Sequence, residues 1–371
     1  RNRRITGIAA VSGLLLLPIN NVSTSLTFHP FSMAVLFSPV LIYFLFRHLK
    51  RSGEDAALPM NLSVAGIGLF ITCAAVNFFH PQLTFDIIVL LGAVVAIQLV
   101  YRTFRPNHPL ASTRAVYAQF VFLVVLFYVW NTQHWKFGAS IQNNVEAFYA
   151  LLDGSQQLGS DVTNRAESAS QIGADPVMIA LKVFLVSLIY AALSAGLVVV
   201  HFLRGSRSAS STEDDILVTY FTIGGFVLAP YMFLQFIGTI SNHFFRHLGF
   251  VMVIATIMGA VAIARIWGRL ESGGGRSTRE WVRHLAVPAA AVLLVASVIV
   301  FYPSPYMYKS SGQVTEQHLS GFESAFASQP ADGSVHFAGI GIGPVREEVA
   351  LTDAQSAPWD GIVQPLPGLS V

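Results

Sequence analysis

Charged residues are scarce in this chain. Asp, Glu, Lys and Arg together make up 11% of its 371 residues, whereas 53% are hydrophobic and the mean hydropathy is +0.58. Soluble domains usually contain about 25% charged residues. The scarcity excludes an ordinary soluble domain and indicates a membrane protein with several spans.

Cysteines, blocks of positive charge and nucleotide-binding motifs are also lacking. Cys73 is the only cysteine, which excludes an internal disulfide and a cysteine-based zinc cluster. The formal net charge is +2 and the basic residues are dispersed, so we expect no nucleic-acid partner. The glycine-rich stretches at 273–275 and 339–343 have neither Walker nor dinucleotide-binding spacing, so no nucleotide cofactor is predicted.

Nine long apolar runs have the composition of membrane spans. They cover residues 5–18, 31–46, 62–79, 85–101, 115–135, 177–203, 216–240, 248–266 and 285–302. The first two are shorter than the roughly 20 residues that a straight crossing needs. Basic residues gather in alternate connections, which the positive-inside rule assigns to the cytoplasm. This alternation predicts an all-α, multi-pass domain of the cell membrane at residues 1–302, with its N-terminus inside and its C-terminus outside.

The two ends of the chain differ from its apolar centre. At residues 303–371, apolar spacing predicts a short helix at 315–327 and a strand at 334–338. We interpret this region as a small or partial α+β segment outside the membrane. The chain starts at Arg1 without Met, so we expect a fragment of a longer protein or, from the basic residues before an apolar run, a signal peptide.

The principal candidate site lies at residues 241–250, S-N-H-F-F-R-H-L-G-F, between two apolar runs. It places His243, Arg246 and His247 at a predicted outer membrane boundary, where ionisable groups are costly and often functional. Arg246 presents a planar fork of donors that suits a phosphate, although it could instead reach the lipid head groups. His243 and His247 are four residues apart and share a helical face, a spacing that also suits a divalent metal. No carboxylate is close in sequence. We therefore expect no cofactor, and a divalent metal is the open alternative.

A second set of candidates stands around the predicted span at 85–101. His80 precedes Pro81 in a Phe-His-Pro motif, which is typical of a helix start; several such starts on one membrane side favour an anion. Asp86 is the only acidic residue in a predicted outer half-span. It either caps the helix or acts as a general base or metal ligand. The second role needs a partner, and His80 is the nearest in sequence.

Residues 136–175 form a long predicted outer connection. Within it, 145–152 has apolar and polar residues at the spacing of a short amphipathic helix lying on the membrane. The connection either covers a substrate or simply joins two helices.

Three strings carry a family resemblance: H-P-F-S-M-A-V-L-F-S-P at 29–39, F-F-R-H-L-G-F at 244–250 and Y-P-S-P-Y-M-Y-K-S-S-G-Q-V-T-E at 302–316. Their order resembles the C-terminal portion of GT-C-type membrane glycosyltransferase-like proteins, in particular large archaeal ones with many spans. The resemblance implies an enzyme of the cell envelope that transfers a sugar from a lipid-phosphate donor at the outer membrane face. Its implied partners are membrane lipids and a lipid-phosphate-linked sugar.

Proteins of that family place a catalytic carboxylate, often within an acidic pair, in the first outer loop. Residues 20–30, the corresponding loop here, contain no acidic pair. Either the family's loop lies upstream of Arg1 or the chain is not a transferase. The resemblance leaves Asp86 as a weak candidate for the catalytic residue. Candidates for binding the substrate are Arg246, His243, His247 and His80.

Two other functions stay open. A transporter or flippase for an anionic lipid-linked glycan favours a broken helix, for which Gly224, Gly225 and Pro230 in the span at 216–240 are the candidates. A non-catalytic assembly subunit would pack through small residues such as those between 255 and 260. The sequence does not indicate an oligomeric state.

Overall fold

The computed structural model describes most of the chain before residue 299 and little after it. The described residues are 3–16, 30–50, 63–133, 135–154, 160–171, 173–205, 213–237, 241–273, 284, 288–298, 320, 324, 337–338 and 363–364. The chain divides into two compact units, Arg1–Tyr302 and Pro303–Val371.

In the second unit, the described residues include two short strands. β1 (Phe337–Ala338) pairs in parallel with β2 (Val363–Gln364). β1 falls within the predicted strand at 334–338. The predicted helix at 315–327 lies outside the described residues except at 320 and 324, so the α+β segment stays a prediction.

The first unit is helical in its described residues. In chain order its helices are α1 (Arg3–Leu16), α3 (Pro30–Leu49), α4 (Val64–Phe79), α5 (Pro81–Phe104), α6 (Tyr117–Asn131), α7 (Trp135–Leu152), α8 (Ser160–Gln171), α9 (Pro176–Gly205), α10 (Glu213–Ile237) and α11 (Ser241–Gly273). A further apolar helix covers Pro288–Val298. Apolar side chains of α3, α4, α5, α10 and α11 form the main core.

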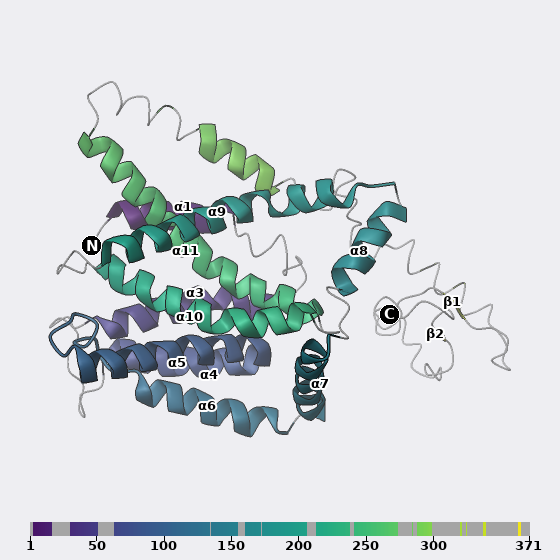
Figure 1. The fold of residues 1–371 in the computed structure, drawn as a ribbon, viewed down its shortest axis with the longest axis horizontal. Helices are drawn as coiled ribbons and strands as arrows, with labels where there is room; N and C mark the ends of the chain where they lie inside the picture. The colour runs from purple at the N-terminus through teal and green to yellow at the C-terminus, as the bar shows by residue number, and fades with distance from the viewer. Residues whose placement is uncertain are drawn as a thin grey trace. The chain divides into compact units, whose positions relative to one another are not determined.

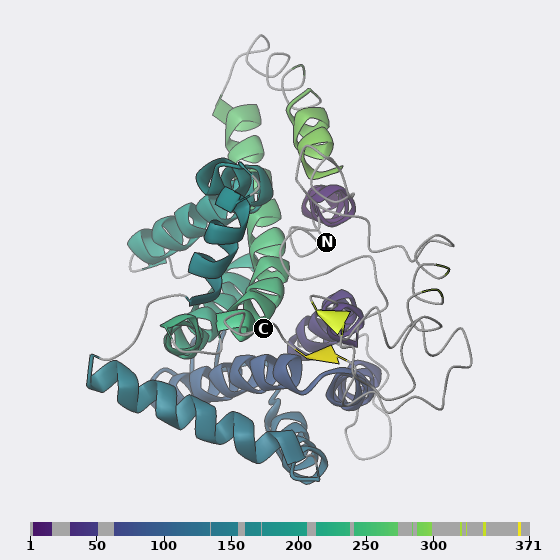
Figure 2. The same ribbon diagram turned by 90° about the vertical axis from the view of Figure 1, so that its right-hand side faces the viewer.

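Figures 1 and 2 show how these helices are arranged. α4, α5, α6 and α10 run roughly alongside one another, and α11 crosses α9. In Figure 1, α7 lies across one end of the bundle, crosswise to α5 and α6. α5 and α11 begin at this end and α10 finishes there; we call it the α7 end.

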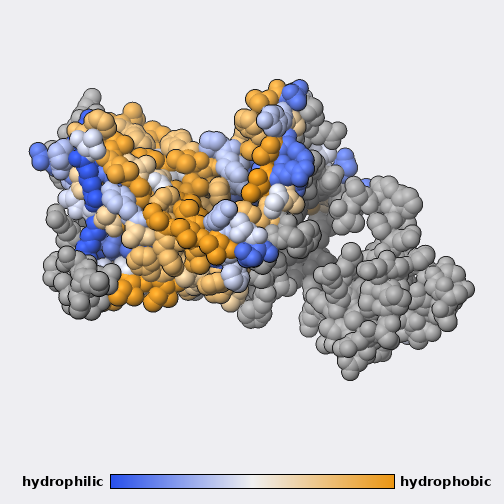
Figure 3. All heavy atoms as spheres, turned by 90° about the horizontal axis from the view of Figure 1, so that it is seen from below, coloured by the Kyte–Doolittle hydropathy of each residue, from blue (hydrophilic) through white to orange (hydrophobic). Residues whose placement is uncertain are grey.

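Four helices are long and apolar enough to cross a membrane: Pro81–Phe104, Pro176–Leu203, Asp215–Phe236 and Arg246–Leu270. Shorter apolar helices cover Met33–Leu49, Val64–Phe79, Tyr117–Asn131 and Pro288–Val298. Figure 3 shows a broad apolar band on the surface of the bundle, with hydrophilic residues gathered toward both of its ends. The chain is therefore a helical membrane protein, and the count of nine spans stays a prediction.

The residues proposed to break α10 do not interrupt it. α10 runs without a gap through Gly224, Gly225 and Pro230. A Cβ atom on Gly224 would lie 2.8 Å from Cδ1 of Leu90, so this glycine lets α10 approach α5 closely. The helix thus uses one of its two glycines for packing rather than for a break.

Small residues also join α9 to α11, where the two helices cross. A Cβ atom on Gly259 would lie 2.6 Å from Cδ1 of Tyr190. Beside this contact, Oγ of Ser194 donates a hydrogen bond of 2.9 Å to the backbone oxygen of Ala255. The hydroxyl of Tyr190 continues the contact to α1 by donating to Oγ of Ser12 at 2.7 Å. These small residues therefore pack inside the bundle, between helices of the same chain.

A matched pair of glycine substitutions tests this packing. In Gly259→Ala, the new methyl group would overlap the ring of Tyr190, and overpacking of this kind costs about 1–3 kcal/mol. In Gly225→Ala, the methyl group meets no described atom within 4 Å and replaces glycine by a better helix former. We expect Gly259→Ala to lower the unfolding temperature in detergent, and Gly225→Ala to leave it unchanged or raise it. Equal effects of the two substitutions would contradict the close crossing of α9 and α11.

Candidate functional site

A buried aspartate and a buried histidine meet near the α7 end of the bundle. Asp86 lies in the second turn of α5, and His247 lies in the second turn of α11. Oδ1 of Asp86 is 2.5 Å from Nδ1 of His247, and both side chains are 0% exposed. The residues are 161 positions apart, so only the packing of α5 against α11 brings them together.

Each partner of this pair keeps one polar atom without a hydrogen bond. Oδ2 of Asp86 and Nε2 of His247 are buried and have no hydrogen-bond partner in the described part of the chain. Buried polar atoms in proteins are nearly always hydrogen-bonded, and exceptions mark strain, catalysis or a bound water or ion. The pair therefore offers two polar atoms to a ligand.

The contact between the two side chains also decides which ring nitrogen of His247 is available. A carboxylate beside Nδ1 holds the ring proton on that nitrogen, which leaves the lone pair of Nε2 as a proton acceptor. A carboxylate without a partner would be costly in this apolar core, so the imidazole also stabilises Asp86 in its place. The pair can thus accept and release a proton inside the bundle.

A tyrosine, a glutamine and an asparagine extend the pair toward α7. The ring of Tyr231 packs edge-on against the ring of His247, with centroids 5.1 Å apart. Nε2 of Gln235 donates to the hydroxyl oxygen of Tyr231 at 2.6 Å and to Oδ1 of Asn144 at 3.3 Å. Asn144 belongs to α7, whereas Tyr231 and Gln235 lie in the last two turns of α10.

Arg246 is half-buried beside the pair in sequence, but it leaves α11 in another direction. Consecutive residues of a helix are about 100° apart, so Arg246 and His247 face different neighbours. The guanidinium of Arg246 makes no hydrogen bond or ion pair with any other residue that the structure describes. A cationic group in this state is available to an anion that reaches the α7 end.

The other predicted site histidines have different surroundings. His80 caps α5, because its Nδ1 accepts a hydrogen bond of 3.2 Å from the backbone nitrogen of Gln82, and its ring packs on Phe31. This is the helix start that the Phe-His-Pro motif predicts, and it gives His80 a structural role. Asp86 has His247 as its partner rather than its neighbour in sequence. His243 lies in the first turn of α11, and its side chain is outside the described residues.

The metal alternative gains one ligand but not a complete set. The structure supplies the carboxylate that the sequence around His247 lacks, since Asp86 contacts its ring. In the described part of the chain, no three His, Cys, Asp or Glu side chains come together as a metal site.

Sequence reasoning missed several buried polar residues near the α7 end. Asn77, in the last turn of α4, is 0% exposed, and both atoms of its amide group lack a partner among the described residues. Oε1 of Gln235 is likewise buried and without a described partner. The signal that could have found them is the presence of a strongly polar side chain inside a predicted span.

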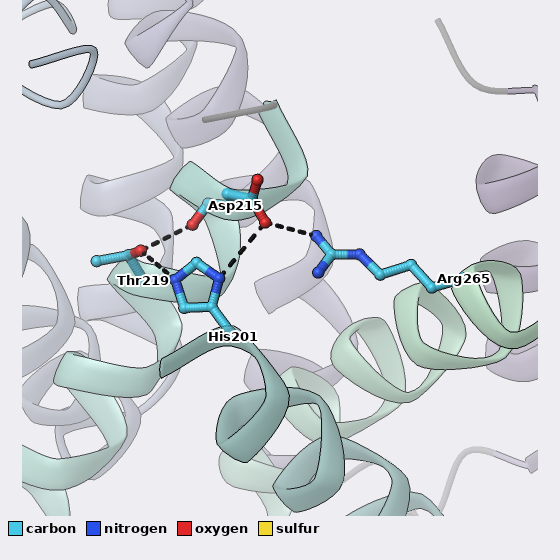
Figure 4. Close-up of polar contacts among 4 residues, drawn as sticks. All are labelled: His201, Asp215, Thr219 and Arg265. Carbon is cyan, nitrogen blue, oxygen red and sulfur yellow. Dashed lines mark hydrogen bonds and ion pairs between the residues drawn. The ribbon is translucent and has the colours of Figure 1, made fainter. Parts of the chain in front are cut away.

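A second ionic cluster lies at the opposite end of the bundle, where α9 finishes and α10 begins. Figure 4 shows its four residues. Oδ1 of Asp215 is 2.9 Å from Nη2 of Arg265 and 3.4 Å from Nδ1 of His201. Nε2 of His201 is 3.0 Å from Oγ1 of Thr219, which donates to the backbone oxygen of Asp215. These side chains pair with one another and join α9, α10 and α11, so we interpret the cluster as structural.

The fold and the buried pair define the class of protein: a helical membrane protein with an aspartate–histidine pair in its core. The chain belongs to the family of unknown function DUF6541, whose model matches residues 1–338. The matched range includes α1 to α11 and therefore the pair and its surroundings. No curated protein and no solved structure matches the chain.

Proposed function

We propose that this protein is a GT-C-like glycosyltransferase that acts on a lipid-phosphate-linked sugar at the outer face of the cell membrane. The observation that carries the proposal is the Asp86–His247 pair, which leaves Nε2 of His247 as a buried proton acceptor. The half-buried Arg246 on the same helix supplies a cation for the phosphate. The resemblance of the strings at 29–39 and 244–250 to this superfamily supports the same reaction.

In the proposed reaction, Nε2 of His247 takes the proton from the hydroxyl group of the acceptor. The hydroxyl oxygen forms a bond to the anomeric carbon of the sugar as the bond from that carbon to the phosphate oxygen breaks. The lipid phosphate leaves with the electron pair, and the guanidinium of Arg246 stabilises its added negative charge. Asp86 holds the reactive tautomer of His247 and offsets the positive charge that forms on the ring. Water then takes the proton from His247.

The proposal includes the topology of nine spans, with the N-terminus inside and the C-terminus outside. The long and shorter apolar helices overlap eight of the nine predicted spans, which supports this count. In this topology the α7 end faces outward. Asp86 and His247 then lie about one and a half helical turns, or roughly 8 Å, below the outer ends of α5 and α11.

A second candidate function is proton-linked transport of an anionic lipid-linked glycan. The observation that favours it is the complete burial of the pair within membrane-crossing helices, because ionisable groups in such positions often belong to proton relays. The two functions predict different products from one reconstituted protein. A transferase forms a new glycosidic bond, whereas a transporter moves an unchanged substrate between the two sides of a sealed vesicle.

Substitution of Arg246 tests the proposed function. In proteoliposomes that contain a lipid-phosphate-linked sugar and an acceptor, we expect Arg246→Ala to lower sugar transfer by about 10²- to 10³-fold, since removal of a group that stabilises developing charge has effects of this size. Arg269→Ala is the matched control, because Arg269 lies exposed at the far end of the same helix. Full activity of Arg246→Ala would contradict the proposal that this residue stabilises the leaving phosphate.

The same assay addresses the divalent metal. We expect activity that depends on Arg246 to persist in EDTA. Loss of activity in EDTA, with recovery on addition of Mg²⁺ or Mn²⁺, would instead show that a metal ion bound to the substrate stabilises the negative charge of the leaving phosphate.

A further inference from the structure

α7 has two different faces at the end of the bundle. Its outward face exposes apolar side chains at helical spacing: Ile141, Val145, Phe148, Tyr149 and Leu152. Its inward face includes Ala147, which is 3% exposed, and the partly buried Asn144. An amphipathic helix that lies crosswise at the end of a membrane bundle is suited to the interface between lipid and water (Figure 1).

A buried glutamine of α10 contacts the inward face of α7. Gln235 is 1% exposed, and its Nε2 donates both to Oδ1 of Asn144 and to the hydroxyl oxygen of Tyr231. Because the hydroxyl of Tyr231 accepts this hydrogen bond, its orientation depends on Gln235. The position of Gln235 depends in turn on α7.

Tyr231 then contacts His247 itself and the residue that directly precedes Asp86. Its ring is edge-on to the ring of His247, at 5.1 Å and 80°. The ring of Tyr231 also lies 4.6 Å from the ring of Phe85, the residue directly before Asp86 on α5. Asp86 at Nδ1 and the ring of Tyr231 thus both contact the imidazole of His247.

We propose that Asn144, Gln235 and Tyr231 are positioning residues for His247, through which the interfacial helix α7 sets the orientation of its imidazole. While α7 is packed against α10, Tyr231 holds the imidazole of His247 so that its Nε2 points in one direction. When α7 moves away from α10, Gln235 loses its hydrogen bond to Asn144 and no longer fixes the hydroxyl of Tyr231. The ring of His247 can then rotate. The catalytic meaning of this coupling rests on the proposed function, but the coupling itself is a property of the bundle.

Nitrogen NMR of the histidine rings tests the proposal without any assay of activity. The full chain is labelled with ¹⁵N-histidine in lipid nanodiscs, and the signal of His247 is identified by its absence in His247→Gln. We expect one narrow set of ring signals in the wild type, with the proton on Nδ1. Asn144→Ala and Gln235→Leu should broaden or shift the signals of His247.

Two internal controls separate positioning from general misfolding. His201 lies at the opposite end of the bundle, so its signals should be unchanged in a variant that alters only the pair. Gln142→Ala removes an exposed side chain of α7 that bonds to Glu146 on the same helix, and it should leave His247 unchanged.

A double variant tests the coupling even if one of the single variants folds poorly. Tyr231→Phe keeps the ring against His247 but removes the hydroxyl that accepts from Gln235. In a Tyr231→Phe background, Asn144→Ala should therefore have no further effect on His247. An unchanged His247 signal in both Gln235→Leu and Asn144→Ala would overturn the proposal, and so would a full effect of Asn144→Ala in the Tyr231→Phe background. If the signals respond as expected but no sugar is transferred, the proposed function fails while the coupling stands.

Discussion

Asp86→Asn is expected to lower sugar transfer by about 10²- to 10⁴-fold while the protein stays folded. Asparagine has the size of aspartate and can still contact Nδ1 of His247, so α5 and α11 keep their packing. It carries no charge to stabilise the protonated ring. Its amide group can also donate to Nδ1, which would place the ring proton on Nε2 and remove the base. Initial rates of transfer in proteoliposomes measure the effect.

Asp175→Asn is the matched control for this substitution. Oδ1 of Asp175 accepts a hydrogen bond of 2.9 Å from the backbone nitrogen of Val177 at the start of α9. Asparagine caps a helix about as well as aspartate, so we expect activity within about twofold of the wild type. Wild-type activity in Asp86→Asn would remove the buried pair from the proposed mechanism.

His247→Leu is expected to lower the free energy of unfolding by about 3–5 kcal/mol, because it leaves the carboxylate of Asp86 buried without a partner. The double variant Asp86→Leu/His247→Leu replaces both groups by apolar side chains. Such replacements of a whole buried pair are often neutral or stabilising, so the double variant should recover most of the loss. Denaturant unfolding in detergent micelles measures both free energies, and the single Asp86→Leu variant completes the cycle.

This stability cycle does not depend on the function of the protein. Additive effects of Asp86→Leu and His247→Leu would show that the two side chains do not interact in the folded bundle, against their 2.5 Å contact. A stable double variant without transfer activity would show that the pair is retained for chemistry rather than for folding.

The start of α5 shows how much local sequence can determine. Pro81 has no backbone N–H to leave unpaired in a first helical turn, and His80 places a ring nitrogen beside the free backbone nitrogen of Gln82. The interactions involve residues that are close in sequence. A Phe-His-Pro motif before an apolar run was therefore enough to predict a helix beginning here.

α10 shows where a local rule was outweighed by packing. Gly224, Gly225 and Pro230 are all unfavourable in helix interiors, and they suggested a broken helix. The helix continues through all three residues, and Leu90 of α5 occupies the space beside Gly224. Membrane helices tolerate such residues because neighbouring helices and local adjustments satisfy the freed backbone groups, which one segment by itself does not show.

The candidate site divides in the same way. The sequence singled out Asp86, Arg246 and His247, because charged and titratable groups inside apolar runs are costly wherever they are placed. It predicted His80 as the partner of Asp86, because a sequence shows only which residues are close along the chain. The direct contact with His247, and the connection through Tyr231 to α7, depend on which faces of α5, α10 and α11 meet.

Composition and the apolar runs by themselves determined that this is a helical membrane protein, because the cost of burying charge and backbone acts on every segment separately. They also singled out the ionisable residues whose burial in an apolar run costs enough free energy to indicate a role. Only the tertiary structure showed that Asp86 and His247 are partners, because a contact across 161 positions follows from the packing of whole helices.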